Sequence, residues 1–440
     1  MRELRFQGTR RVAAVSVTLL AVGLAVTGCA PASQPTPSAS PTPAQPEPFA
    51  IQAPSLPGVQ TYGGSYSASL GSYSASLSGV TIGQDGSMTA VGWAPSDGDF
   101  AGGAQLPTSG DYGSVGVGGL VIHVDAQGSA WALFPGGDSI GSLKSVALAG
   151  DGDIIAVGGP LMGAGAATIV RIHPDGTLVW ARDFSAMMAS FFAVALGADG
   201  DIVVAGYTTS SDGDSTSAPP GVANALLAKF TPDGDLMWAN TYGEASGDAG
   251  SLLLGVAVTS DGGVVAVGWG SAANGSFGCP GGHPGGQCGI AVRAAADGST
   301  VWREAVPQTS NLQGVAVASD GSVLVVGSSD GYMALVSSLT GDGAVNWTAT
   351  QNNSTFNSVA IAPGGTALVA GDSTLAKVNP DGSLGQVRTT ELIDSTFYGV
   401  AVGPDGGAVA VGEVASPSSS STAKKGTLAV IARLLPDSGQ

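Results

Sequence analysis

A phrase of the form Gly-Val-Ala-Val-x-x-Asp-Gly-x-Val-x-Val-Val-Gly recurs seven times along this chain of 440 residues. The copies span residues 79–93, 145–158, 193–206, 255–268, 314–327, 358–371 and 399–412. Their centres are 41 to 66 residues apart, and in the sixth copy Gly364 replaces the aspartate. Self-similarity at such a period predicts a repeat architecture, because one unit cannot bury its apolar faces alone.

Each copy is followed by a second Asp-Gly phrase, typified by residues 225–238, which end in Asp-Gly-Asp-Leu-Met-Trp. Asp-Gly between apolar, β-branched runs predicts a hairpin, because the turn needs residues that tolerate positive φ. Two hairpins per unit make four antiparallel strands, the content of one propeller blade. We therefore predict an all-β fold, a seven-bladed β-propeller of four-stranded antiparallel blades, over residues 58–440.

The two ends of the repeat region complement each other. The seventh unit ends at Gln440, where a fourth strand is due, whereas residues 58–64 resemble the fourth strand at residues 238–244. We predict that the propeller is closed by an N-terminal strand in the last blade, which removes an exposed sheet edge.

The Pro-Asp-Gly-x-x-x-Trp phrase at residues 174–180 and 232–238, joined to the first phrase, resembles the bacterial β-propeller repeat proteins of the SBBP type. The resemblance covers about residues 58–440. It implies the propeller fold and a secreted or surface protein. It implies no chemistry, because unrelated functions share such turns.

The N-terminus predicts export and a lipid anchor. Four arginines precede the short apolar stretch 12–26, as in a secretory signal peptide. The stretch ends in Val-Thr-Gly-Cys29, which resembles the processing box of bacterial lipoproteins, so residues 1–28 are expected to be removed and Cys29 to carry acyl chains such as palmitate. The Pro/Ser/Thr-rich segment 29–57 is then an extended tether from the lipidated cysteine. The expected location is a bacterial membrane, namely the outer membrane or cell surface in a Gram-negative cell.

The net charge of the protein restricts the classes of molecule that it can bind. Loss of residues 1–28 removes four arginines and Glu3, so the formal charge of −18 becomes −21. Nucleic acid is excluded as a partner by the missing basic footprint. The expected partners are the membrane, through the N-terminal lipid, and an envelope or extracellular protein or glycan. No phosphate-binding loop has the required strand–helix context, and we expect no cofactor.

Candidate binding residues lie in the loops that do not recur. In such blades both Asp-Gly turns lie on one face of the disc, and the variable loops lie on the other, where binding usually resides. The loops carry acidic and aromatic side chains, with Tyr207 near them: Asp97, Asp99, Phe100, Asp111, Tyr112, Asp212, Asp214 and Phe277. No loop completes a calcium-binding pattern, so these acids are more simply solvated turn residues.

Cys279 and Cys288 bracket a Gly-rich loop that contains His283. In an exported protein, two cysteines this close favour a disulfide. The alternative is a metal site formed by Cys279, His283 and Cys288, which lacks the usual ligand spacing. We predict the disulfide and no metal.

The recurring tryptophans are expected to pack between blades, and His123 and His173 are expected at comparable strand positions. No catalytic arrangement of Ser, His and Asp or of paired carboxylates is evident. We therefore expect a binding or scaffolding module that acts through its variable-loop face and is not an enzyme. The alternative is a hydrolase, lyase or oxidoreductase whose site lies at the mouth of the central channel.

Overall fold

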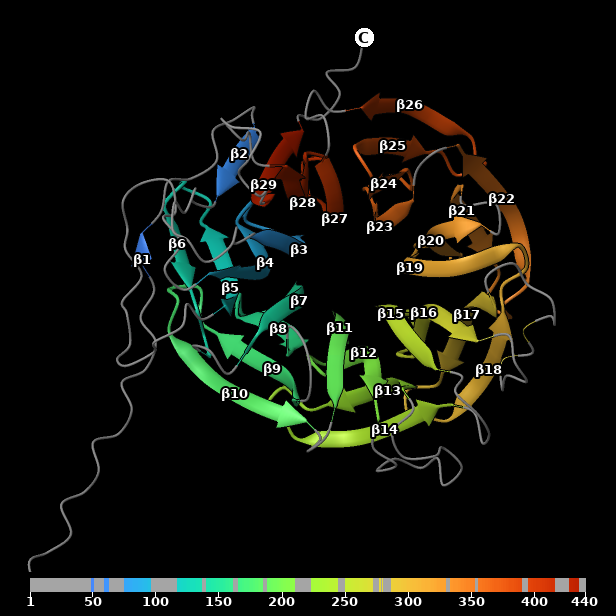
Figure 1. The fold of residues 1–440 in the computed structure, drawn as a ribbon, viewed down its shortest axis with the longest axis horizontal. Coiled ribbons are helices and arrows are strands. Elements are labelled where there is room, and N and C mark those ends of the chain that lie inside the picture. Colours follow the sequence, from blue (N-terminus) through green and yellow to red (C-terminus); the bar gives the residue numbers. More distant parts are fainter. Residues whose placement is uncertain are drawn as a thin grey trace, which may run out of the picture. The chain divides into compact units, whose positions relative to one another are not determined.

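The structure is a computed structural model. It describes residues 49–50, 59–62, 75–95, 117–136, 140–160, 165–184, 188–209, 223–243, 250–271, 277, 279, 286–329, 333–352, 355–389, 395–415 and 427–434. Intrachain contacts divide the chain after Ala44, and every strand lies in the unit Gln45–Gln440. In this unit, seven antiparallel sheets form a ring around a central axis (Figure 1). The prediction of a seven-bladed β-propeller with four-stranded blades is confirmed.

Each blade runs outward from an innermost strand. The innermost strands are β3 (Ser76–Ile82), β7 (Ser142–Leu148), β11 (Ala189–Leu196), β15 (Ser251–Val258), β19 (Thr309–Val317), β23 (Phe356–Ile361) and β27 (Ser395–Val402). The second strands are β4 (Met88–Pro95), β8 (Ile154–Gly159), β12 (Ile202–Thr208), β16 (Val264–Ser271), β20 (Val323–Ser329), β24 (Ala367–Gly371) and β28 (Ala408–Ala415).

The outer half of each blade comes from the second phrase. The third strands are β5 (Val117–Val124), β9 (Ala167–Ile172), β13 (Asn224–Phe230), β17 (Gln287–Ala294), β21 (Ala334–Leu339), β25 (Thr374–Val378) and β29 (Thr427–Leu434). The fourth strands of blades one to six are β6 (Ala130–Leu133), β10 (Leu178–Phe184), β14 (Leu236–Tyr242), β18 (Thr300–Ala305), β22 (Val345–Gln351) and β26 (Leu384–Thr389).

The two short N-terminal strands join the outer edges of blades one and seven. β1 (Phe49–Ala50) pairs with β6 and adds a fifth strand to blade one. β2 (Val59–Tyr62) pairs antiparallel with β29, with Val59 opposite Ala432 and Tyr62 opposite Ala429. Blade seven therefore has the strand order β2-β29-β28-β27. That this pairing closes the ring energetically stays a prediction.

The core lies between the blades. Seven clusters of buried apolar side chains fill the seven junctions, and each cluster takes residues from two adjacent blades. One of them joins Val409 and Ile431 of blade seven to Leu77 and Ile122 of blade one. Burial of these side chains is what holds flat sheets side by side in a ring.

The Asp-Gly turns differ in one respect from the tight hairpins predicted. In the first turn Gly83 N–H donates to Ser87 O, Gly86 N–H donates to Gly83 O, and only Gly86 has positive φ, at 86°. The aspartate keeps negative φ and acts through its side chain, since Asp85 Oδ1 accepts the Ser87 N–H at 2.9 Å. The loop is thus longer than two residues, and the aspartate stabilises it as a side-chain acceptor.

The tryptophans pack between blades, as predicted. Trp131 Nε1 donates to Pro174 O of the next blade at 3.0 Å, and Trp302 Nε1 donates to Gly341 O at 3.1 Å. A Cβ at Gly298 would meet the Trp238 ring, so the turn glycine of one blade leaves room for the tryptophan of the blade before it. This contact explains why Asp-Gly and Trp recur together.

Candidate functional site

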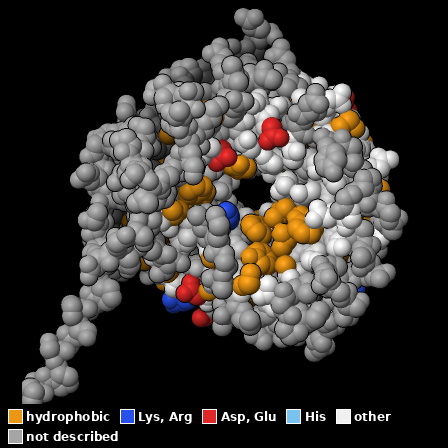
Figure 2. Space-filling view, viewed as in Figure 1, with side chains coloured by type: hydrophobic (Ala, Val, Ile, Leu, Met, Phe, Trp, Pro, Cys, Tyr) orange, Lys and Arg blue, Asp and Glu red, His pale blue; other side chains and the backbone are white. Residues whose placement is uncertain are grey.

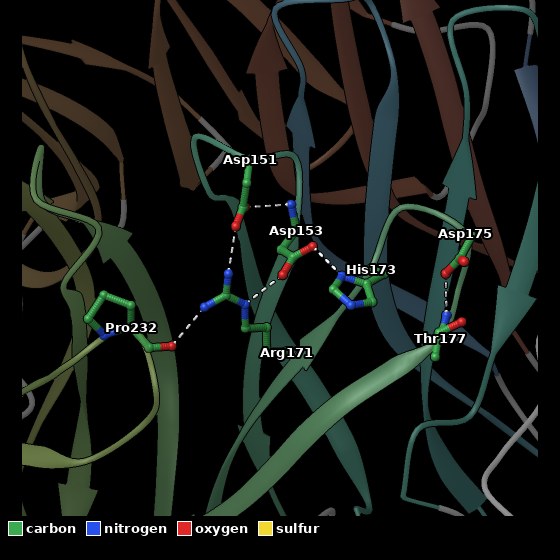
Figure 3. Close-up of polar contacts among 7 residues, drawn as sticks. All are labelled: Asp151, Asp153, Arg171, His173, Asp175, Thr177 and Pro232. Atoms are coloured by element: carbon green, nitrogen blue, oxygen red, sulfur yellow. Dashed lines mark hydrogen bonds and ion pairs between the residues drawn. The ribbon is translucent and has the colours of Figure 1, made fainter.

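Charged side chains gather at the Asp-Gly end of the second blade (Figure 3). Arg171 donates from Nε to Asp153 Oδ2 at 2.6 Å and from Nη2 to Asp151 Oδ2 at 2.7 Å. Its Nη1 donates to Pro232 O of the third blade at 2.9 Å, and His173 Nδ1 lies 2.7 Å from Asp153 Oδ1. Arg171 therefore links both hairpins of its own blade to the next blade.

The same cluster recurs in other blades. Lys229 Nζ lies 2.7 Å from Asp201 Oδ2 in blade three. Arg293 donates to Asp261 in blade four and, at 2.7 Å, to Gly341 O of blade five. Because the arrangement repeats with the fold, we assign it to the scaffold and not to catalysis.

The two histidines do not occupy the comparable positions expected. His123 pairs with Thr89 across the sheet and is buried, which places it where blade two has Arg171. Its Nδ1 lies 2.9 Å from Thr89 Oγ1, and burial lowers its pKa. His173 instead starts a turn, and its hydrogen bond with Asp153 raises its pKa. The mismatch arises because both precede a turn, but by different numbers of residues.

A second recurring feature lies near the middle of the innermost strands, away from the Asp-Gly turns that follow them. In every blade the pairing with the second strand skips the residue just before the seven-fold phrase, which marks a β-bulge, and blade five also skips Ser310. The residues skipped before the phrase, from blade one to blade seven, are Ser78, Lys144, Phe192, Leu254, Gln313, Asn357 and Tyr398. All are partly or largely exposed, and together they form what we call the bulge ring.

The backbone of the bulge ring is fixed from both sides. The residue before each bulge is a fully buried Leu or Phe, such as Leu143 or Phe191. Opposite it stands the last glycine of the phrase, such as Gly158, where an added Cβ would overlap the Ser142 carbonyl oxygen. The same overlap holds for all seven of these glycines. Glycine recurs there because the bulge brings two backbones together.

Neighbouring bulges are also connected around the ring. A Cβ at Gly79 would lie 3.0 Å from Lys144 O, so the residue after each bulge must be small. Val194 N–H donates to Ser145 Oγ at 3.2 Å, and Asn357 Nδ2 donates to Phe397 O at 2.9 Å, each across a blade junction. The bulge positions are thus held rigidly, while their side chains are free to differ.

The side chains of the bulge ring divide it into unlike arcs. Blades three and four contribute Phe192 and Leu254, and the Phe192 ring stacks on Tyr207 of β12 at 5.8 Å between centroids. Trp269 of β16, paired with Leu252, is also partly exposed. Figure 2 shows an apolar patch beside the central opening, with one basic side chain next to it.

The opposite arc is polar. Gln313 and Asn357 come from blades five and six, and Tyr398 of blade seven is 37% exposed. The Tyr398 hydroxyl donates to Glu413 Oε1 at 3.1 Å, and burial together with the Glu413 charge raises its pKa. This arc carries amide and phenol groups, of which Asn357 and Tyr398 already donate to Phe397 O and to Glu413.

Most of the predicted loop residues lie outside the described residues, namely Cys29, Asp97, Asp99, Phe100, Asp111, Tyr112, Asp212, Asp214 and His283. Phe277 is described, but it is only 6% exposed and packs against Tyr242 in the core. Its ring is therefore not available to a ligand at the surface.

The predicted disulfide is confirmed, because Cys279 and Cys288 are bonded. Their sulfurs are then not free to act as thiolate ligands. In the described residues, no group of three or more His, Cys, Asp or Glu is placed to hold a metal ion. No helix in this part of the chain has the length and hydropathy of a membrane span.

The bulge ring was missed from the sequence, although its signal is present. It occupies the position just before each seven-fold phrase, where the residue changes in every copy. A residue that varies at a fixed backbone position is the useful signal.

Known proteins resemble this chain in structure only. No protein-family model matches it, and no curated protein matches it in sequence. A structure of streptogramin B lyase aligns with a TM-score of 0.52 and 14% identity over 86% of this chain and 98% of that one. A chain from a mitotic checkpoint complex aligns with a TM-score of 0.52 and 12% identity over 95% and 100%. At such identities the likeness shows the β-propeller fold alone.

Proposed function

We propose that this chain is an exported, lipid-anchored β-propeller that binds an envelope or extracellular protein or glycan at its channel mouth and the loops around it. One observation carries the proposal: seven bulges of one geometry present seven different side chains. Elsewhere in the repeat, several positions keep one chemistry, as the last glycine of the phrase does in all seven copies. Rigid presentation of unlike side chains is what specific recognition requires.

Binding is favoured over catalysis by the chemistry of the mouth. Lys144 and Tyr398 are the only titratable side chains of the seven innermost strands. Tyr398 already donates to Glu413. A general acid and base pair is not assembled from these strands.

Site-specific photo-crosslinking in cells tests the binding site. A photoreactive phenylalanine analogue replaces Phe192 or, separately, Tyr398, and the matched control replaces Val301, which is 57% exposed on β18. We expect adducts from both mouth positions and none from the control. Equal adducts at all three positions, or none at the mouth, would contradict a specific site there.

The proposed anchor is tested separately. Cys29→Ala removes the acylated thiol, so we expect the protein to leave the membrane fraction, because its charge gives no affinity for anionic lipid. Mass spectrometry of the N-terminal peptide should find acyl chains on Cys29 in the wild type. Unchanged membrane recovery of the variant would contradict the anchor.

A further inference from the structure

Lys144 is the only charged residue on the seven innermost strands of this strongly acidic protein. It is the bulge residue of blade two. Other cations of the described fold, such as Arg171, Lys229 and Arg293, each pair with aspartates. Lys144 forms no ion pair or hydrogen bond through its amino group in the described part of the chain.

The partial burial of Lys144 destabilises its charged form, because no carboxylate among the described residues pairs with it. Its side chain is partly buried, and burial lowers its pKa with no opposing carboxylate. A desolvated ammonium group gains stability from an anion that approaches it, because little water competes for the charge. An acidic protein that keeps one unpaired cation at its channel has a specific place for a negative charge.

The next two blades supply apolar surface beside this cation. Phe192 and Leu254 follow Lys144 around the bulge ring, and Tyr207 stacks on Phe192. The hydrogen bond from Val194 N–H to the Ser145 side-chain hydroxyl joins the strands that carry Lys144 and Phe192. A cation next to aromatic and aliphatic side chains matches a ligand that has an anionic end and an apolar body.

We infer that the channel mouth binds a carboxylate attached to an apolar group, with the carboxylate at Lys144 and the apolar body on Phe192 and Leu254. This inference rests on the proposed function, since it names the ligand chemistry of the same site. Two sources carry this chemistry: a fatty acid, and a peptide C-terminus with an apolar last residue.

Titration calorimetry on the full chain with four probes tests the inference and separates the sources. The fatty-acid arm uses octanoate with octanamide as its neutral match. The peptide arm uses N-acetyl-Ala-Phe with a free carboxylate and the same peptide as an amide. We expect at least one carboxylate to bind, and its neutral match to bind at least tenfold more weakly. Equal affinity for acid and amide in both arms would overturn the inference.

Substitutions at Lys144 and Phe192 test whether these side chains bind the carboxylate and the apolar body. Lys144→Met should weaken binding of the preferred carboxylate at least tenfold, whereas Lys144→Arg should retain most of it, because the charge remains. Phe192→Ala should weaken the acid and its amide by the same factor. Arg303→Met removes an exposed cation on β18 and should change nothing. Unchanged affinity in Lys144→Met would assign the carboxylate to another site and overturn the inference.

Failure of this inference is distinguishable from failure of the proposed function. If no carboxylate binds while crosslinks still form at Phe192 and Tyr398, the mouth is a binding site for different chemistry. If carboxylates bind at Lys144 but no cellular partner crosslinks, the ligand class stands and the macromolecular partner is wrong.

Discussion

The Asp-Gly turns and the bulge ring are built by the same repeat and yet differ in kind. At the Asp-Gly end, backbone and side chains both recur, as Asp151, Asp199 and Asp261 with their cations show. At the bulge ring, only the backbone recurs, and the side chains run from Lys144 through Phe192 to Gln313. Side chains that recur in every blade stabilise the ring. A backbone that recurs with a different side chain in each blade forms a surface of varied chemistry.

Blade seven differs from the other six in how its outer strand is supplied. Its outer strand, β2, comes from the other end of the described fold. We expect deletion of residues 58–64 to lower the thermal unfolding midpoint by several degrees, because β29 loses its partner and becomes an exposed edge. Calorimetry measures this. An unchanged midpoint would show that β2 does not close the ring.

Glycine serves both the turns and the bulges, but for different reasons. We expect Gly158→Ala at a bulge to cost about 3 kcal/mol or more, because the methyl group overlaps the Ser142 carbonyl. Gly321→Ala at a turn should cost about 1 kcal/mol, because φ is +84° but the space is open. Urea denaturation of both variants checks the difference. Equal costs would mean that the bulge relaxes to admit a side chain.

The cations at the Asp-Gly end should matter for stability alone. Arg171→Met leaves Asp153, whose side chain is only 6% exposed, without its main partner, and we expect a loss of about 2 kcal/mol. Arg303→Met, on an exposed strand position, should stay within about 0.5 kcal/mol of the wild type. Ligand capture at the mouth should be equal in both variants. Weaker capture in Arg171→Met alone would assign this cluster a role in binding.

The turn aspartates add a smaller, pH-dependent contribution. Hydrogen bonds from the Ser322 hydroxyl and backbone lower the pKa of Asp320, so its stabilising effect is present above the unfolded pKa and lost as pH falls through the folded one. We expect Asp320→Ala to lower the unfolding midpoint at pH 7 by less than Arg171→Met does. The difference in unfolding midpoint between this variant and the wild type should vanish at acidic pH. A difference that persists at low pH would mean that the carboxylate charge is not responsible.

The sequence predicted the fold well because the residues that form the strands, turns and blade contacts recur in each unit. The Asp-Gly phrases predicted hairpins. Residues such as Trp238 predicted inter-blade contacts, since this tryptophan packs against the turn glycine Gly298 of the next blade. The candidate binding residues stay largely untested, because Phe277 is the only one of them among the described residues. Phe277 lies in a turn after β16 but is buried, and Lys144 stands at the position before the phrase, where the residue changes in every copy. Only the strand register reveals that one residue is skipped.

Substitutions at the bulge positions are expected to change stability least. Exchanging bulge side chains, by Leu254→Gln or Gln313→Leu, should change the unfolding free energy by less than about 0.5 kcal/mol, because these side chains are not part of a blade junction core. The neighbouring Leu253→Gln places an amide in a fully buried position and should cost about 3 kcal/mol. Ligand binding should respond in the opposite order, since we propose Leu254 as a ligand contact, whereas Leu253 lies in the core. If Leu254→Gln unfolds the protein as readily as Leu253→Gln, the bulge residue belongs to the scaffold, and the turns and the bulge ring differ less than we argue.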